Sequence, residues 1–465
     1  MIVLSNRSSQ TCRKIIQFLL ADVKRVVVGR EGEDRISELP ANVIDRILEL
    51  LPVKDAAKTS ILSKNWRYNW AMLSNLQLNK AFCYKLAVKS RSVFKETVDT
   101  ILLLHLGAIV KFNLDVSGLR RSSYGHIDRW MLNVTRNDVK ELYLHMFDNS
   151  SYKLSSYVLN CPTLKKLELF NCVFKPPNPF VGSRHLITIR LESITFVPTT
   201  EFIVINCPLL VNLALLDCRG TQYLKIVVSS RLEYLLQLEI DEVVDNPNRE
   251  HDERSTLEKL LLSVAATLEF FLMGLGYFEL LTADTIPKGP PFTRLQELSL
   301  GIDFGKLSQT TCALQLIKSC PNLSKLQIWG CASRDSAEAV LKYLKRPITC
   351  LDLRLNELKY VGISSHECSK TELLFVKLLF ACTPSLVRMC YEQQKPFDSS
   401  DERKLTRKLM CFSRASPSIF RIRRLRTTTC IAYIMRNTRF TMCRITGAMT
   451  ISSSVPCSII KQPLH

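Results

Sequence analysis

Apolar residues in the segment 34–70 recur at the three-to-four spacing that is typical of amphipathic helices. The segment reads DRISELPANVIDRILELLPVKDAAKTSILSKNWRYNW. Pro40 suits the first turn of a helix that Pro52 ends, and Asp55 and Ser63 are suitable caps for two more helices. We therefore predict three short helices. A module of this size is too small to bury all these apolar side chains by itself, so part of its apolar surface is expected to serve a partner.

From about residue 105 onward the pattern changes to an apolar hexad of the form L-x-x-L-x-L, the strand signature of leucine-rich repeats. Hexads begin at Ile109, Val139, Leu164, Leu186, Leu210, Leu235, Leu268, Leu295, Leu323, Ile348 and Leu386. Three of them share a longer frame, CPTLKKLELFNC, CPLLVNLALLDC and CPNLSKLQIWGC, in which one cysteine precedes proline and another follows eleven positions later. The repetition predicts an uneven solenoid of short parallel strands, each followed by a returning helix or loop.

Two segments near the end of this array predict a cap. Residues 372–391 predict a helix followed by a strand, and residues 401–417 predict an amphipathic helix with Leu405, Leu409 and Phe412 on its apolar face. A cap is needed because the last repeat would otherwise expose its core. The acidic, polar stretch 241–254 is expected to loop out from the array.

The net charge of +20 is concentrated at one end of the sequence. Between Arg403 and His465 there are 13 Lys and Arg residues and no acidic residue, so the rest of the chain is only mildly basic. One interpretation is a basic tail in which RIRRLR (421–426) contacts phosphate or directs nuclear import. The other is that residues 421–465, like residues 1–33, do not belong to the fold and are disordered.

No pattern in the sequence indicates a catalytic, cofactor or metal site. The 17 cysteines form no CxxC pair, and those in the repeats recur in frame with the strand leucines, so we expect reduced thiols that pack as small apolar side chains. There is no phosphate-binding glycine loop, and the seven histidines are scattered. Segment 260–281 has the length of a membrane span but contains Glu269 and Glu279, which favours a buried helix followed by a strand.

The helical segment, the CPxL repeats, and the blocks FVKLLFACTPSLVRM and LMCFSRASPSI together resemble the plant F-box proteins that carry leucine-rich repeats and an FBD domain. The resemblance covers roughly residues 34–420. It implies an α/β fold with a three-helix F-box (34–80), an irregular leucine-rich-repeat array (105–343) and an FBD-like cap (344–420). Residues 1–33 and 421–465 lie outside it.

The resemblance implies a non-catalytic substrate-recognition subunit of a Skp-cullin-F-box ubiquitin ligase, in the nucleus, the cytoplasm or both. The F-box would dock a Skp-type adaptor, which links it to cullin and RING subunits, and the repeats would bind an unknown target protein. No cofactor and no membrane partner are implied. Carried over position by position, the adaptor surface comprises Leu39, Pro40, Ile44, Ile47, Leu48, Leu51, Pro52, Ile61, Leu62, Trp66 and Trp70. Large, centrally buried groups dominate such interfaces, which favours Leu39, Pro40 and Trp66, whereas Trp70 suits the core of the F-box equally well.

Three other hypotheses stay open from the sequence. The chain could be a basic nuclear or nucleic-acid-associated protein that acts through its tail, although nucleic acid is the less favoured partner. It could also be a scaffold that binds the adaptor but delivers no target, or a non-functional relic with altered ends.

Overall fold

The computed structural model describes residues 39–116 except residue 65, then 124–146, 151–176, 184–198 and 203–220, and, with short gaps, much of 224–238, 261–331 and 337–424. The predictions for residues 1–33, for the insertion 241–254 and for residues 425–465 lie outside these ranges.

The helical segment 39–74 contains two α-helices and two short 3-10 helices. These are α2 (Ala41–Glu49), α3 (Val53–Lys58), η1 (Thr59–Ile61) and η2 (Asn69–Met72). Pro40 is the residue just before α2, and its carbonyl oxygen accepts hydrogen bonds from the Val43 and Ile44 amides at 2.9 and 3.1 Å. The predicted third α-helix around Trp66 and Trp70 is wrong, because turns and η2 take its place. Both indoles are buried there, so tertiary packing rather than helix propensity sets the backbone.

Thirteen parallel strands form one sheet in the order β1-β2-β3-β4-β6-β9-β11-β12-β13-β14-β15-β16-β17. Their bounds are β1 (Asn75–Leu78), β2 (Lys111–Asp115), β3 (Glu141–His145), β4 (Lys166–Phe170), β6 (Thr188–Glu192), β9 (Asn212–Leu216), β11 (Tyr234–Leu238), β12 (Phe270–Met273), β13 (Glu297–Asp303), β14 (Lys325–Cys331), β15 (Tyr360–Ser365), β16 (Arg388–Gln393) and β17 (Ile419–Arg424). Two smaller parallel pairs join β5 (Val173–Phe174) to β7 (Thr195–Phe196) and β8 (Ile203–Cys207) to β10 (Leu224–Val228). The predicted α/β solenoid of parallel strands is confirmed.

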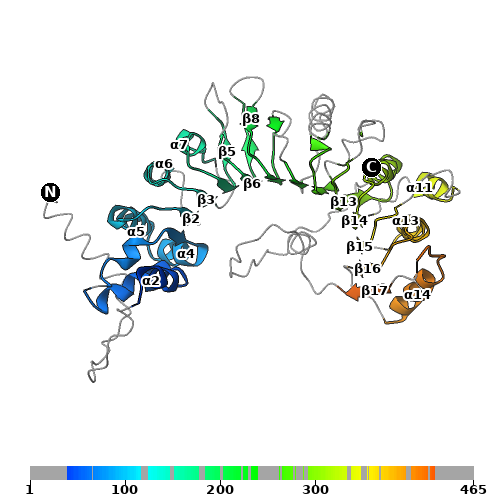
Figure 1. Cartoon of the computed structure of the whole chain (residues 1–465), viewed down its shortest axis with the longest axis horizontal. Coiled ribbons are helices and arrows are strands. Elements are labelled where there is room, and N and C mark those ends of the chain that lie inside the picture. Colours follow the sequence, from blue (N-terminus) through cyan, green and yellow to red (C-terminus); the bar gives the residue numbers. More distant parts are fainter. Residues whose placement is uncertain are drawn as a thin grey trace, which may run out of the picture. The chain divides into compact units, whose positions relative to one another are not determined.

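Helices connect many of the strands. They are α4 (Lys80–Lys89), α5 (Arg91–Leu104), α6 (Tyr124–Arg136), α7 (Ser156–Leu159), α10 (Leu307–Lys318), α11 (Ala337–Leu344), α13 (Lys370–Cys382) and α14 (Ser399–Met410). Figure 1 shows α6, α7, α11 and α13 on the same side of the row of strands. The inward strand residues and the apolar sides of these helices form one continuous core, to which Leu405 and Leu409 of α14 belong as predicted. None of the described helices combines the length and the apolar character that crossing a bilayer requires.

Nine of the eleven predicted hexads coincide with strands of the main sheet. The hexad assigned to Leu235 begins at Leu232 instead, because Leu235 aligns with Phe271 in the register and Gln237 takes the third, normally apolar position. The hexad assigned to Ile348 begins within residues 347–352, which lie outside the described ranges. Strand β15 instead carries a hexad formed by Leu358, just before the strand, and by Val361 and Ile363 within it. A further hexad, at Leu73, Leu76 and Leu78, forms β1 and was missed.

The sheet runs without interruption through segments that the sequence divides into separate domains. Strand β1 lies inside the range assigned to the F-box yet pairs with β2. Strands β15, β16 and β17 lie in the FBD-like range or at its end and pair in series with β14. Residues 421–424, assigned to the basic tail, form the end of β17 in register with β16, so the fold extends at least to Arg424.

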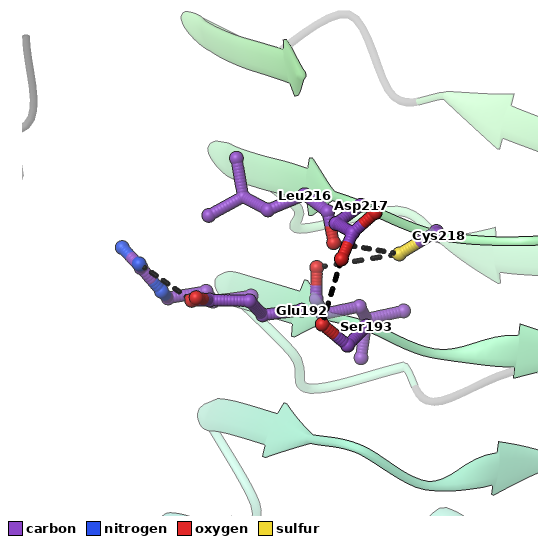
Figure 2. A network of polar contacts seen from close by, with 7 residues as sticks. Glu192, Ser193, Leu216, Asp217 and Cys218 are labelled. Atoms are coloured by element: carbon purple, nitrogen blue, oxygen red, sulfur yellow. Dashed lines mark hydrogen bonds and ion pairs between the residues drawn. The ribbon is translucent and has the colours of Figure 1, made fainter. Parts of the chain in front are cut away.

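Short polar residues form the turns that end three neighbouring strands. Asn171, Ser193 and Asp217 follow β4, β6 and β9 with φ angles of 62°, 54° and 50°, a left-handed conformation that asparagine and aspartate tolerate better than most residues. The Ser193 amide donates to the carbonyl oxygen of Leu216 at 2.8 Å, and its hydroxyl lies 3.1 Å from the Asp217 carboxylate (Figure 2). The turns therefore repeat from strand to strand and bond to one another.

The repeat cysteines that follow these turns are buried in the wall of the array. Cys172 and Cys218 are each one residue beyond a left-handed turn. The Cys218 Sγ lies 3.4 Å from the Leu216 carbonyl oxygen and 3.5 Å from that of Leu191 (Figure 2). Burial raises the pKa of Cys218 to about 12 and that of Cys172 further. Both thiols therefore stay protonated at neutral pH and pack as apolar groups.

Candidate functional site

Helix α2 carries one apolar stripe, part of which is buried and part exposed. Ile44 and Leu48, one turn apart, are buried in the core of the helical segment. Val43 and Ile47, also one turn apart, are 37% and 38% exposed. The outer pair therefore contributes little to the segment's own core. Because the buried pair and the exposed pair lie next to each other on one apolar stripe, the sequence pattern does not distinguish them.

Further exposed apolar side chains lie at the end of α2 and in and after η1. Leu50 is 79% exposed and Leu62 is 65% exposed, which are high values for leucine in a folded chain. We call the set of exposed residues on α2, η1 and their ends the apolar face, and it comprises Val43, Ile47, Leu50, Leu51, Ile61 and Leu62. Clustered exposed apolar side chains on a small module indicate a protein-binding surface.

The predicted adaptor residues differ in their exposure to solvent. Six of them are exposed, namely Pro40, Ile47, Leu51, Pro52, Ile61 and Leu62, while Leu39 is partly buried against the core. Ile44, Leu48, Trp66 and Trp70 are buried, so the structure does not present them to a partner. Trp66, which we expected to dominate docking, is only 3% exposed and belongs to the core of the segment. Val43 and Leu50, which are not among the predicted residues, are exposed as well.

A second candidate surface is the face of the sheet opposite the inward strand residues, which we call the open face. On its first strands this face is lined by charged side chains that pair with one another. Lys111 on β2 lies 3.3 Å from Glu141 on β3, and Lys166 lies 3.0 Å from Glu168 within β4. Arg190 and Glu192 of β6 are 2.9 Å apart. This part of the open face thus carries alternating charges that largely compensate each other.

Tyr143 on β3 lies at the centre of these charges. Its hydroxyl donates to the Glu141 carboxylate at 2.7 Å, and the Nζ atoms of Lys111 and Lys166 lie 4.9 and 5.1 Å from its ring centroid. Partial burial alone would raise the pKa of Glu141, but the Tyr143 hydrogen bond and the two lysines outweigh it and hold that pKa below its ordinary value. The arrangement is ordered and charged, and suits polar recognition.

The open face is more aromatic at β14 and β15. The Trp329 indole lies close to Gly301 on β13, where an added Cβ atom would be 2.8 Å from the indole nitrogen. A side chain at position 301 would therefore clash with the indole, and glycine leaves the space that the indole occupies. Tyr360, at the start of β15, is 45% exposed. A partner on the open face would meet charges at β2–β6 and aromatic rings at β14–β15.

No metal-binding geometry accompanies these surfaces within the described parts of the chain. No group of three or more His, Cys, Asp or Glu side chains there is arranged to hold a metal ion. Of the cysteines in those parts, Cys411 is exposed, whereas the repeat cysteines that can be assessed are buried.

Comparison with known families identifies both parts of the chain. The F-box domain matches residues 36–78, and the leucine-rich-repeat domain described for At1g61320/AtMIF1 matches residues 101–247. The first match covers α2, α3 and the apolar face. The second begins in α5 and extends past β11, and the sheet continues beyond it to β17.

Individual relatives come from Arabidopsis thaliana. The chain is 27% identical over 382 residues to the F-box/FBD/LRR-repeat protein At1g13570, covering 77% of this chain and 90% of that protein. It is 33% identical to the F-box/LRR-repeat protein At3g59200 over 38% of this chain and 32% of the relative. With the FBD-associated F-box protein At5g56370 the identity is 33% over 38% of this chain and 42% of the relative. The chain thus spans most of the first relative and less than half of the other two.

Proposed function

Because the chain carries an F-box domain followed by leucine-rich repeats, as the plant F-box/FBD/leucine-rich-repeat proteins that it resembles do, we propose that it is the substrate-recognition subunit of a Skp-cullin-F-box ubiquitin ligase. The pairing of these two domains supports a substrate-recognition role in ubiquitin ligases. The proposal includes specific partners: a Skp-type adaptor, the cullin and RING subunits that it links, and a target protein. In this proposal the chain binds the target protein and positions it, and its partner subunits transfer ubiquitin to the target. The complex works in the nucleus, the cytoplasm or both.

The apolar face is the observation that carries this proposal. A leucine-sized side chain contributes about 1.5 to 3 kcal/mol when it is fully buried, and association consumes part of that gain through lost translational and rotational entropy. Several such side chains are needed for tight docking, and the apolar face offers them on one small module. A few of them dominate such interfaces. We expect Ile47 and Leu62 to be among these, since both were predicted for the adaptor surface and both are exposed.

The open face supports target binding by a different physical route. Charged groups that already pair with one another, such as Lys166 and Glu168, gain little additional energy from a partner. They do exclude partners with mismatched charge, so they contribute specificity and orientation more than affinity. The aromatic end near Trp329 supplies large contact areas that bind more strongly.

The test is a pull-down of the full-length chain with a purified Skp-type adaptor. An Ile47→Ser, Leu62→Ser double variant removes two exposed apolar groups, and about a hundredfold loss of affinity is expected from the burial they would lose. A matched control is Tyr157→Ser with Val387→Ser, because these side chains are exposed to a similar degree on the repeat array. Circular dichroism of each variant verifies that the fold is retained.

Wild-type binding that only the Ile47/Leu62 variant loses would support the proposal. Failure of the folded wild type to bind the adaptor would refute it. Equal loss in the control variant would show that binding is nonspecific and would also refute it.

A further inference from the structure

Exposed large apolar side chains extend beyond the F-box into the junction with the repeats. Of the exposed large apolar residues in the described ranges, most lie between Val43 and Leu106. Leu103, near the end of α5, is 66% exposed, and Leu106, just beyond that helix, is 63% exposed. Their neighbours Ile101 and Leu102 are buried, so the local core is already filled without them. The exposure of Leu103 and Leu106 therefore calls for a different explanation.

The junction is fastened directly to the F-box by backbone hydrogen bonds. The Leu106 amide donates to the Ala71 carbonyl oxygen at 2.8 Å, and the Gly107 amide donates to the same oxygen at 3.3 Å. Ala71 and Met72 belong to η2, and Met72 is 50% exposed. An added Cβ atom at Gly107 would lie 2.8 Å from the Met72 carbonyl oxygen, so only glycine permits this close approach. Leu106 is thereby placed beside Met72.

The same part of the F-box adjoins the apolar face. Helix α2 packs against η2, and η1 packs against η2 as well. The Ser74 hydroxyl lies 3.3 Å from the Glu49 carboxylate, which places the end of α2 beside the residues that follow η2. Leu50 comes directly after Glu49. Exposed apolar residues thus occur on α2, at Met72 in η2 and at Leu106, whose backbone is bonded to η2.

We propose that the docking surface for the Skp-type adaptor extends onto this junction through Met72, Leu103 and Leu106, which we call the junction strip. The inference rests on the proposed function, because the adaptor is the partner that the apolar face serves. A standard interface involves about 20 to 30 residues on each side. That is more than the exposed residues of α2 and η1 provide, and the junction strip is the adjoining apolar surface.

Such a contact has a mechanical consequence. Residues 105–107 lead into β2, and the amides of Val110 and Lys111 both bond to the carbonyl oxygen of Ser74. An adaptor that touches both the F-box and the junction strip holds the first repeats at a fixed angle. The target on the open face is then presented to the ubiquitin-transferring subunits in a fixed orientation.

The test uses the full-length chain and a purified Skp-type adaptor. A Leu103→Ser, Leu106→Ser variant makes two exposed side chains polar, so the fold is retained, as circular dichroism and thermal unfolding verify. The matched control is Tyr84→Ser with Val88→Ser on α4, where the side chains are 58% and 67% exposed but lie outside the strip. Titration calorimetry is expected to give about a tenfold higher Kd for the junction variant and no more than about a twofold change for the control.

Hydrogen exchange of the wild-type chain provides a second measurement that needs no variant. Binding of the adaptor is expected to protect amides in residues 103–110 as well as those in α2. Unchanged Kd in the junction variant, equal weakening in the control, or absence of protection at 103–110 would each overturn the inference. If the Ile47/Leu62 variant still loses binding in those cases, the proposed function stands. If the wild-type chain binds no adaptor, both proposals fail.

Discussion

The F-box and the repeat array use the same kinds of apolar residue in opposite ways. In the array, leucines at the inward strand positions, such as Leu142, Leu167 and Leu298, are almost completely buried in a continuous row. In the F-box, leucines at similar density are divided between a small core and a largely exposed surface. The array buries its apolar residues through repetition, because each repeat covers the next. Among the described residues, the outer side of the F-box keeps apolar side chains such as Leu50 and Leu62 exposed, and this area is available to a partner.

The difference shows why burial has to be known before a binding residue can be assigned. Within the F-box, Trp66 and Tyr68 are two residues apart and both aromatic, yet only Tyr68 is exposed. Leu48 and Leu50 are likewise two residues apart, and Leu48 is buried whereas Leu50 is exposed. In each pair, one residue stabilises the module and the other is free to bind.

The largest expected effect is on the core of the F-box. Trp66→Ala removes a buried indole and should lower the free energy of unfolding of this module by about 3 to 5 kcal/mol. Tyr68→Ala, at a side chain that is 60% exposed, should change it by no more than about 0.5 kcal/mol. Urea denaturation followed by tryptophan fluorescence and circular dichroism measures both. A Trp66→Ala variant of unchanged stability that fails to bind the adaptor would instead restore Trp66 as a docking residue.

An intermediate effect is expected at the turns of the array. Asn171→Ala places a residue that disfavours the left-handed conformation at a φ of 62°, which should cost about 1 kcal/mol. Asn171→Gly is the control, since glycine adopts this conformation readily and should be close to neutral. Thermal unfolding of the two variants compares them directly. Equal loss in both would mean that the Asn171 side chain, rather than its backbone conformation, stabilises the turn.

The smallest effect is expected on the charged part of the open face. Because the pKa of Glu141 is lowered in the folded chain, its ionised form stabilises the fold above the unfolded-state pKa, and this contribution is lost as the pH falls through the folded-state value. Glu141→Gln should therefore be less stable than wild type at pH 7, by at most about 0.5 kcal/mol for so exposed a pair.

The difference between Glu141→Gln and wild type should vanish in acid, where Glu141 is protonated in both the folded and the unfolded chain. Denaturant unfolding midpoints of the variant and of wild type, measured from pH 7 down to pH 3, give this difference at each pH. Glu168→Gln is measured beside it as a second variant on the same face. A difference that grows on acidification would contradict the assigned direction of the pKa shift.

Most of the array could be predicted from the sequence because its physical rule is repeated many times. The hexads at Leu164, Leu210 and Leu323 mark strands, since an inward leucine is needed at the same place in every repeat. The rule fails where a repeat places a polar residue at a normally apolar position. Gln237, which aligns with Met273 of β12, is such a residue, and the hexad of β11 was therefore placed three residues too late.

The F-box surface was harder to predict for a different reason. Sequence spacing locates the apolar stripe of α2 but does not say which part of it the rest of the chain covers, so it does not separate the buried Ile44 and Leu48 from the exposed Val43 and Ile47. The turn that replaces the third helix depends on the packing of Trp66 and Trp70, which no local pattern encodes. The junction strip depends on hydrogen bonds from Leu106 and Gly107 to Ala71 of η2, which lies more than thirty residues earlier in the sequence.

The backbone ladder of the sheet has a consequence for how such genes change. The Lys165 amide bonds to the Lys140 carbonyl oxygen, and the Ile187 amide bonds in the same way to that of Lys165. Removal of residues 166–187, or their duplication, would join equivalent positions and leave both the ladder and the inward pattern intact. A change in the number of repeats can therefore lengthen or shorten the open face in whole steps without a change in the F-box.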